Sequence, residues 1–297
     1  MKTKLLASLS IGAAAMLSTA PAHALFINVV NDPDPANTLV AALFGANSGI
    51  NVVAGSASFV GRTTVGEEQS ATYTNFNLSP NSGSGATITN PNGILLTTGH
   101  ANLPTSNTTE SFSNALNQPG TGSNAQLSAL SGQSTNDQNY LTFQFTVEAG
   151  FNAILANLVF ASDEFPTQTV TDIFGFFVDG INYAFFQGGA LVSNIPQANF
   201  QNNPVGADGY PIEYNGLTTS LLIEGLLDPT LTTHTLTIAI ADTSDSIYDS
   251  AAFVGGLRAG NGTGGGIINP VPEPSILGLL GVGLAGLGAL RARRRKG

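Results

Sequence analysis

The sequence predicts an all-β domain of the β-sandwich or jelly-roll type with one short N-terminal helix. Several segments alternate apolar and polar residues with period two, as half-buried strands do. Clusters of Gly, Asn, Pro and Ser separate the apolar segments at intervals of about ten residues, the spacing of a sandwich. Seventeen phenylalanines and an apolar fraction of 42% supply a substantial core, so we expect a folded chain despite its 35 glycines.

The chain begins with a segment typical of a secretory signal peptide. Two lysines precede an apolar run from Leu5 to Leu17, and the small residues Ala22 and Ala24 follow. A basic start, a short apolar stretch and a small-x-small cleavage site define such a signal. The apolar run is too short to cross a hydrocarbon layer of about 30 Å as a permanent helix. We therefore expect signal peptidase to remove residues 1–24 and the mature chain to begin at Leu25.

The first half of the mature chain offers one helix and one clear strand. Asn37–Phe44 has the helical pattern, with Asn37 as the expected N-cap and Gly45 as the stop. Gly93–Gly99 is an apolar island that we expect to be a strand. Asn102–Gln126 is rich in Asn, Ser, Thr and Gly and is expected to be a long ordered loop, a class of connection that is often functional.

The second half is richer in strands. Leu141–Val147 and Thr235–Ala239 alternate with period two and are expected to be half-buried strands. Ile154–Ala161 and Ile173–Val178 are denser apolar runs, which suit strands buried on both faces. Gly260–Pro270 is expected to be a flexible linker, so that the folded domain ends at residue 259.

The C-terminal tail, residues 271–297, is a second export signal. Ile276–Leu290 is apolar but rich in glycine, and as a helix rising about 1.5 Å per residue it reaches only about 23 Å. Such a helix crosses a bilayer only by thinning it. The positive-inside rule keeps the basic cap that follows it in the cytoplasm. The members of that cap are Arg291, Arg293, Arg294, Arg295 and Lys296.

A Pro-Glu-Pro triplet, formed by Pro272, Glu273 and Pro274, precedes this helix. The order of triplet, short apolar helix and basic cap resembles the PEP-CTERM sorting signal of Gram-negative bacteria. The resemblance implies that the tail holds the precursor in the inner membrane until an exosortase, a membrane cysteine peptidase, processes it near the triplet. It also implies display on the cell surface or in the extracellular matrix.

Composition excludes several function classes for the segment between the two signals. Residues 25–270 hold eighteen acidic residues against only Arg62 and Arg258, which gives a net charge of −16. Such a surface repels nucleic acid and anionic membrane and attracts divalent cations. The segment contains neither Cys nor Met, so disulfides, thiolate catalysis and Cys-ligated metals are excluded.

Five blocks between the signals resemble, in their order, the choice-of-anchor L domain, a bacterial extracellular module found on different surface-anchoring tails. The resemblance extends from about Asn37 to Leu257 and implies no particular chemistry. One departure is Phe165 after Asp163-Glu164, where the family more often has Tyr. The blocks are GILLTTGHA (93–101), DQNYLTFQF (137–145), VFASDEF (159–165), DIFGFFVDGINYA (172–184) and IADTSDSIYDSAAFV (240–254).

Acidic residues close to the ends of these expected strands are candidate calcium ligands. Ca²⁺ takes six to eight oxygen ligands, and the loops at the edge of a β-sandwich can supply them. The same residues also suit turns with solvated charges, and the sequence leaves both interpretations open. The candidates are Asp163, Glu164, Asp172, Asp242, Asp245 and Asp249.

Two further function classes compete with a purely structural one. A pair of these carboxylates would suffice for glycoside hydrolysis, whereas His100 and His234 stand in no metal-ligand spacing and no G-x-S-x-G motif is present. Aromatic residues next to Asn, Gly or Asp could instead build calcium-bridged sugar sites, although core packing explains them as well. The aromatic candidates are Tyr73, Phe76, Tyr183, Phe185, Phe186, Tyr210, Tyr214 and Tyr248.

We therefore expect an exported, exosortase-processed and non-catalytic protein of the surface or extracellular matrix, associated with exopolysaccharide or biofilm. Stabilisation by calcium is one of the two interpretations that the acidic residues leave open. A calcium-dependent glycan-binding adhesin is the first alternative, and a carboxylate-based glycoside hydrolase is the second. The expected partners are signal peptidase, exosortase and matrix components, with transient contact with the inner membrane through the C-terminal helix.

Overall fold

The computed structural model describes residues 25–82, 85–109, 121–166, 171–195, 197–206 and 208–268. Among these residues, no helix has the length and apolar character needed to span a bilayer. The signal peptide with Ala22 and Ala24, the Pro-Glu-Pro triplet, the predicted sorting helix and its basic cap all lie outside the described residues.

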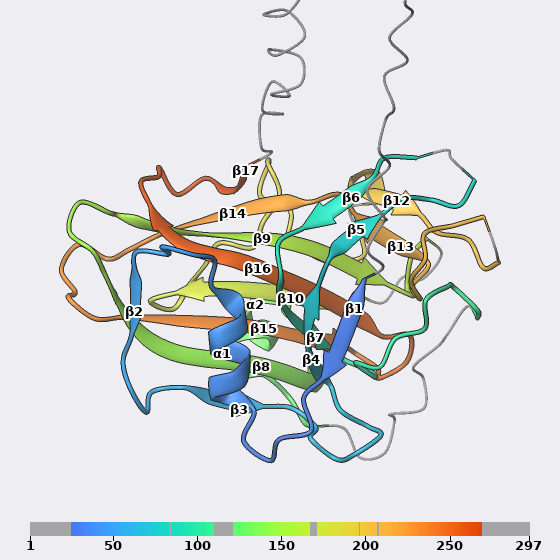
Figure 1. Cartoon of the computed structure of the whole chain (residues 1–297), viewed down its shortest axis with the longest axis horizontal. Coiled ribbons are helices and arrows are strands. Elements are labelled where there is room, and N and C mark those ends of the chain that lie inside the picture. The colour runs from blue at the N-terminus through green and yellow to red at the C-terminus, as the bar shows by residue number, and fades with distance from the viewer. Residues whose placement is uncertain are drawn as a thin grey trace, which may run out of the picture.

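Two antiparallel sheets pack face to face to form the sandwich predicted from the sequence (Figure 1). The larger sheet has nine strands. From one edge inward they are β1 (Phe26–Val29), β4 (Ser70–Thr74), β7 (Gly93–Thr97), β16 (Ser250–Gly260) and β9 (Ala153–Ser162). Beyond β9, the strands β13 (Gly216–Thr218) and β12 (Phe200–Asn202) continue from one end of it, and β14 (Leu221–Leu226) and β17 (Gly266–Ile268) from the other.

The smaller sheet has six strands, and its central strand is β15. A separate two-stranded hairpin, β5 and β6, lies over the outer face of the larger sheet. The six strands are β11 (Ile181–Asn182), β10 (Ile173–Val178), β15 (His234–Thr243), β8 (Thr135–Val147), β2 (Ile50–Val52) and β3 (Ser58–Val60). The hairpin strands are β5 (Phe76–Leu78) and β6 (Ile88–Asn90), and a short 3₁₀ helix, η2 (Gln197–Asn199), precedes β12.

The main core fills the space between the sheets. Alternate residues of each strand point into it, because successive side chains of a strand face opposite sides. Phe174 and Phe176 enter from β10, and Ala252 and Val254 enter from β16 of the other sheet. The outer face of the larger sheet is covered as well. Beneath the hairpin, an edge-to-face aromatic group is formed by Tyr73, Phe76 and Phe253.

The helix α1 (Ala36–Leu43) confirms the one helix expected near the N-terminus. It contacts β7 and β16 of the larger sheet and β8 of the smaller one, so it closes one side of the sandwich (Figure 1). The expected cap is wrong. Pro35 occupies the N-cap position without a side-chain hydrogen bond, and Asn37 lies exposed in the first turn. Burial of Leu39 and Leu43 against both sheets stabilises this helix in place of a cap.

A second helix, α2 (Ala125–Ser131), corrects the end of the loop expected over Asn102–Gln126. Its N-cap is Asn124, whose side-chain oxygen accepts a hydrogen bond from Leu127 N at 3.0 Å. Gly132 ends it in the left-handed conformation. Leu127 packs on the outer face of the smaller sheet, against residues of β10 and β15.

The strands follow the sequence closely, with one difference in burial. Strands β8, β9, β10 and β15 coincide with or extend the predicted segments, and β7 ends two residues before the predicted end at Gly99. β8 alternates in burial as expected of a half-buried strand. β15 is instead buried on nearly its whole length, because α2 covers its outer face.

The stretch expected to be a flexible linker is attached to the domain up to residue 268. β17 pairs with β14, and Ile267 N donates to the carbonyl of Phe185 at 3.0 Å. The Glu224 carboxylate accepts hydrogen bonds from Thr263 N at 2.5 Å and from Gly264 N at 2.6 Å. Glycine suits this segment because a side chain at position 262 would collide with Glu224. The ordered domain therefore continues past residue 259.

Candidate functional site

The acidic residues predicted as ligands lie at strand ends on one end of the sandwich. Asp163 and Glu164 directly follow β9, and Asp249 directly precedes β16, which pairs with β9. In the other sheet Asp172 directly precedes β10, and Asp242 lies near the end of β15, which pairs with β10. Antiparallel pairing brings the end of one strand next to the start of its neighbour, so both sheets place their acids at the same end.

The register sets two aspartates opposite each other in each sheet. Ile173 pairs with Ala241 in antiparallel register, which brings Asp172 opposite Asp242. In the larger sheet Ser162 pairs with Ser250, and Asp163 N donates to the carbonyl of Asp249 at 3.1 Å. Like charges directly opposite each other destabilise a sheet. The domain therefore maintains two unfavourable pairs at this end.

Asp172 and Asp242 face the core between the sheets. Asp172 lies on the same face of its strand as Phe174, and Asp242 on the same face as Ile240. Ser250 approaches from the larger sheet, and its hydroxyl donates to Asp172 Oδ2 at 2.6 Å. The apolar core therefore ends here in polar side chains from both sheets. We call Thr98, Glu164, Asp172, Asp242, Asp249 and Ser250 the inter-sheet polar cluster.

The cluster is sealed from solvent. Thr98, Asp172, Asp242 and Ser250 are each 0% exposed, and Glu164 and Asp249 are each 2% exposed. Thr98 and Ser250 are joined by two hydrogen bonds, from Thr98 N to the Ser250 carbonyl and from Ser250 N to Thr98 Oγ1. The Thr98 hydroxyl in turn donates to Asp249 Oδ1 at 3.4 Å. The interpretation of these acids as solvated turn residues is wrong, because the strand ends turn them inward.

Burial raises the pKa of three of these carboxyl groups. The pKa of Glu164 rises to about 8 because of burial and the nearby charges of Asp245 and Asp249. Burial, followed by the charge of Glu164, raises the pKa of Asp172 well above its usual range. The pKa of Asp242 is raised by burial and by Asp172, and the neighbouring Thr98 hydroxyl offsets a small part of that rise.

No basic side chain of the mature chain is available to neutralise the cluster. Lysine is absent from residues 25–270, and Arg62 and Arg258 are the two arginines. Arg62 forms an ion pair with Glu67 at 2.8 Å. Arg258 is exposed and lies toward the other end of β16. No basic side chain is among the groups that shift the pKa of Glu164, Asp172 or Asp242, which are buried together.

The two other predicted ligands have different surroundings. Asp163 Oδ1 accepts a hydrogen bond from Asn215 N at 3.1 Å. Asp245 is partly exposed, and its Oδ1 accepts from Ile247 N at 3.3 Å within the turn between β15 and β16. Within the described ranges, no group of three or more acidic or histidine side chains is already arranged to hold a metal ion.

His234 lies apart from the cluster, and His100 follows Thr98 of the cluster by two residues. His234 starts β15, and its Nδ1 lies 2.7 Å from Asp179 Oδ2. Eight residues of strand separate it from Asp242, which is about 26 Å at about 3.3 Å per residue. His100 is partly buried near Glu67 and Glu68, and burial lowers its pKa. A reaction based on His234 therefore cannot draw on the buried carboxylates.

The aromatic residues considered for sugar binding are mostly part of the core. Tyr73, Phe76, Tyr183, Phe186, Tyr210 and Tyr214 are buried, whereas Phe185 and Tyr248 are partly exposed. Stacking on a sugar needs an accessible ring face, which the buried six do not offer. The structure therefore supports the core interpretation of those six rings.

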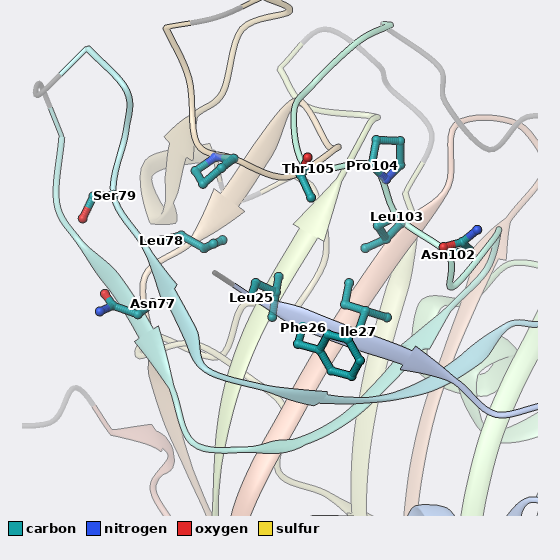
Figure 2. A pocket seen from close by; sticks show the side chains of 11 residues that line it. Leu25, Phe26, Ile27, Asn77, Leu78, Ser79, Asn102, Leu103, Pro104 and Thr105 are labelled. Carbon is teal, nitrogen blue, oxygen red and sulfur yellow. The ribbon is translucent and has the colours of Figure 1, made fainter. Parts of the chain in front are cut away.

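A groove among the described residues lies elsewhere and is mainly apolar. Figure 2 shows Leu25, directly before β1, and Ile27 of β1 among the residues that line it, together with Leu103 and Pro104 of the segment after β7. Its volume is about 480 Å³, and no acidic, basic or histidine residue lines it. The side chain of Phe26 is 61% exposed. Ser79 and Thr105 are among its lining residues, but no acidic or histidine side chain lines it that could serve as their general base.

Comparison with known proteins confirms both resemblances seen in the sequence. The family model described as the choice-of-anchor L domain matches residues 29–257, which is most of the chain. The chain belongs to the choice-of-anchor L family. The PEP-CTERM protein-sorting motif matches residues 270–295. No curated protein and no solved structure matches the chain.

The blocks that carry the choice-of-anchor L resemblance supply every member of the inter-sheet polar cluster. Thr98 belongs to GILLTTGHA, Glu164 to VFASDEF and Asp172 to DIFGFFVDGINYA. The remaining members come from IADTSDSIYDSAAFV. The PEP-CTERM motif implies export to the cell envelope or surface and recognition by exosortase.

Proposed function

We propose that the mature domain is a non-catalytic protein of the cell surface or extracellular matrix. A Gram-negative cell exports it as a membrane-bound precursor, and exosortase releases it by cleaving the C-terminal tail. The two family matches support export and surface display. Exopolysaccharide or another matrix component is the proposed partner, since a domain with charge −16 is poorly suited to nucleic acid or anionic membrane.

The burial of the inter-sheet polar cluster is the observation that argues against catalysis. Glycoside hydrolysis requires two carboxyl groups that flank the scissile bond and contact substrate and water. Glu164 and Asp172 have the raised pKa values of candidate acids. They are nevertheless only 2% and 0% exposed, and no sugar ring can enter between the sheets. The raised pKa values therefore follow from the burial of these groups and do not indicate that they act as catalytic acids.

Fractionation of the producing cells tests the display proposal. We expect the protein in the surface or matrix fraction, with an intact mass that lacks both residues 1–24 and the basic cap Arg291 to Lys296. Recovery of only the full-length tail from the cell surface would contradict exosortase processing. A variant with Pro272, Glu273 and Pro274 changed to Ala is the control, and it should accumulate as an uncleaved membrane precursor.

A hydrolysis screen tests the absence of catalysis. The processed protein is incubated with polysaccharides and aryl glycosides beside a variant that carries Asp163→Asn, Glu164→Gln and Asp172→Asn. We expect no turnover above background from either protein. Turnover that the wild type shows and the variant lacks would make the cluster an active site and overturn the proposal.

A further inference from the structure

Four buried carboxylate oxygens of the inter-sheet polar cluster accept no hydrogen bond. They are Glu164 Oε2, Asp172 Oδ1 and both side-chain oxygens of Asp242. Asp242 is 0% exposed and points from β15 toward the gap where Asp172 and Ser250 meet. Buried polar atoms in proteins are almost always hydrogen-bonded, so four such oxygens at one place require an explanation.

Neither protons nor the protein's own cations provide that explanation. A carboxylate without a partner is costly to bury, by several kcal/mol for an ion of this size. The arginines of the mature chain lie elsewhere, as described above. A proton shared between Asp172 and Asp242 would join only two of the four oxygens, and each further proton would add a buried O–H donor that itself needs an acceptor.

We propose that a calcium ion binds between the two sheets at this end of the sandwich, with Asp172 and Asp242 as its acidic ligands. The hydroxyl oxygens of Thr98 and Ser250 are the nearest neutral ligands, and Glu164 Oε2 lies on the same end of the sandwich. A site built on two carboxylates and neutral oxygens agrees with the lack of a three-acid group among the described residues. The ion would join β10 and β15 to β16, as the Ser250–Asp172 hydrogen bond does.

The chemistry of the cluster selects calcium among the common cations. Its side chains offer only oxygen, which excludes ions that prefer nitrogen or sulfur. Mg²⁺ usually retains several waters, and a site with 0% exposed ligands has little room for them. Ca²⁺ accepts six to eight protein oxygens in flexible geometry. The inference rests on these contacts alone and does not depend on the proposed surface function.

Calcium binding to the processed protein, after removal of metal with EDTA, tests the site. We expect a calorimetric binding signal for Ca²⁺ and a rise of about 5–10 °C in Tm at hundredfold excess over the Kd, with a much smaller rise for Mg²⁺. The central variant is Asp242→Asn, and Glu148→Gln is the matched control because Glu148 is exposed at the end of β8.

The two variants should separate a metal site from a general charge effect. Without calcium, Asp242→Asn should melt above the wild type because it removes a carboxyl group that is costly to bury ionised and costly to protonate, and its Tm should not respond to calcium. Glu148→Gln should retain the full calcium response. The proposal is overturned if wild-type protein shows neither heat nor a Tm shift, or if Asp242→Asn responds as the wild type does. Neither result would affect the fractionation test of surface display.

Discussion

The hydroxyl of Ser250, in the larger sheet, donates a 2.6 Å hydrogen bond to Asp172 Oδ2, at the start of β10 in the smaller sheet. Both residues are fully buried. This contact joins the two layers at the end where the apolar core stops. It also favours the ionised form of Asp172, because the hydroxyl donor lowers the pKa that burial raises.

Replacement of Ser250 by alanine should therefore loosen the two sheets at this end. The change leaves Asp172 Oδ2 buried without its donor, which costs about 1–3 kcal/mol in the free energy of unfolding. Urea unfolding in EDTA measures the loss. Ser58→Ala, at an exposed position of β3, is the control and should cost less than about 0.5 kcal/mol. Equal losses for the two variants would contradict the role of the contact.

The metal-free protein should lose stability as the pH rises through the neutral range. Glu164 has a pKa of about 8 in the folded state and an ordinary value of 4.5. Between these values the folded state holds a proton that the unfolded state has released. The contribution of Glu164 to the free energy of unfolding is therefore largest below about pH 4.5 and decreases until about pH 8.

Urea unfolding in EDTA at pH 5 and pH 8 measures this effect. Glu164→Gln should show a smaller decrease than the wild type, which separates the contribution of Glu164 from that of other carboxyl groups. Calcium binds the ionised carboxylates, so its stabilising effect should be larger at pH 8 than at pH 5. If the stability of the wild type falls no more between pH 5 and pH 8 than that of Glu164→Gln, the raised pKa of Glu164 is not the cause of the pH dependence.

The Gly-rich strap, defined as residues 260–268, should detach when Glu224 loses its acceptor oxygens. Glu224→Leu removes the hydrogen bonds to Thr263 N and Gly264 N, whereas Glu224→Gln keeps one carbonyl oxygen in the same place. We expect amide exchange in the strap to accelerate at least tenfold in the leucine variant and much less in the glutamine variant. Hydrogen–deuterium exchange measured by mass spectrometry resolves the segment. Equal exchange in both variants would show that Glu224 does not hold it.

Helix α2 should depend on its N-cap. Asn124→Ala removes the acceptor for Leu127 N, which is expected to cost about 1 kcal/mol in the free energy of unfolding. Asn51→Ala, at an exposed position of β2, is the matched control and should change stability little. Urea unfolding compares the two. A loss as small as that of the control would mean that packing of Leu127 alone maintains the helix.

The sequence predicts the strands well because their side-chain pattern reflects burial directly. Ile173–Val178 is apolar at every position, and the structure buries it on both faces. Helix α2 could have been predicted from Asn124 and Gly132, which carry the cap signals at both of its ends. The helix has only seven residues, and the Asn-, Ser-, Thr- and Gly-rich composition of the loop before it concealed those signals.

The candidate site was predictable in its residues but not in its environment. Asp172 lies two residues before Phe174, so period-two alternation alone places its side chain toward the core. Turn composition suggested solvent instead, and that suggestion is wrong. The pairing of Asp172 with Asp242 depends on strand register between segments far apart in the sequence, which no local pattern contains. The approach of Ser250 additionally requires the packing of one sheet on the other.

The central position of β16 has a consequence for the timing of folding. This strand lies between β7 and β9, yet it is the second-last strand along the described chain. Until residues 250–260 are available, β7 and β9 each leave an unpaired apolar edge, the state most prone to mispairing. The sheet can therefore close only when the chain is available almost to its sorting motif, so in the export that we propose, translocation and folding would finish together.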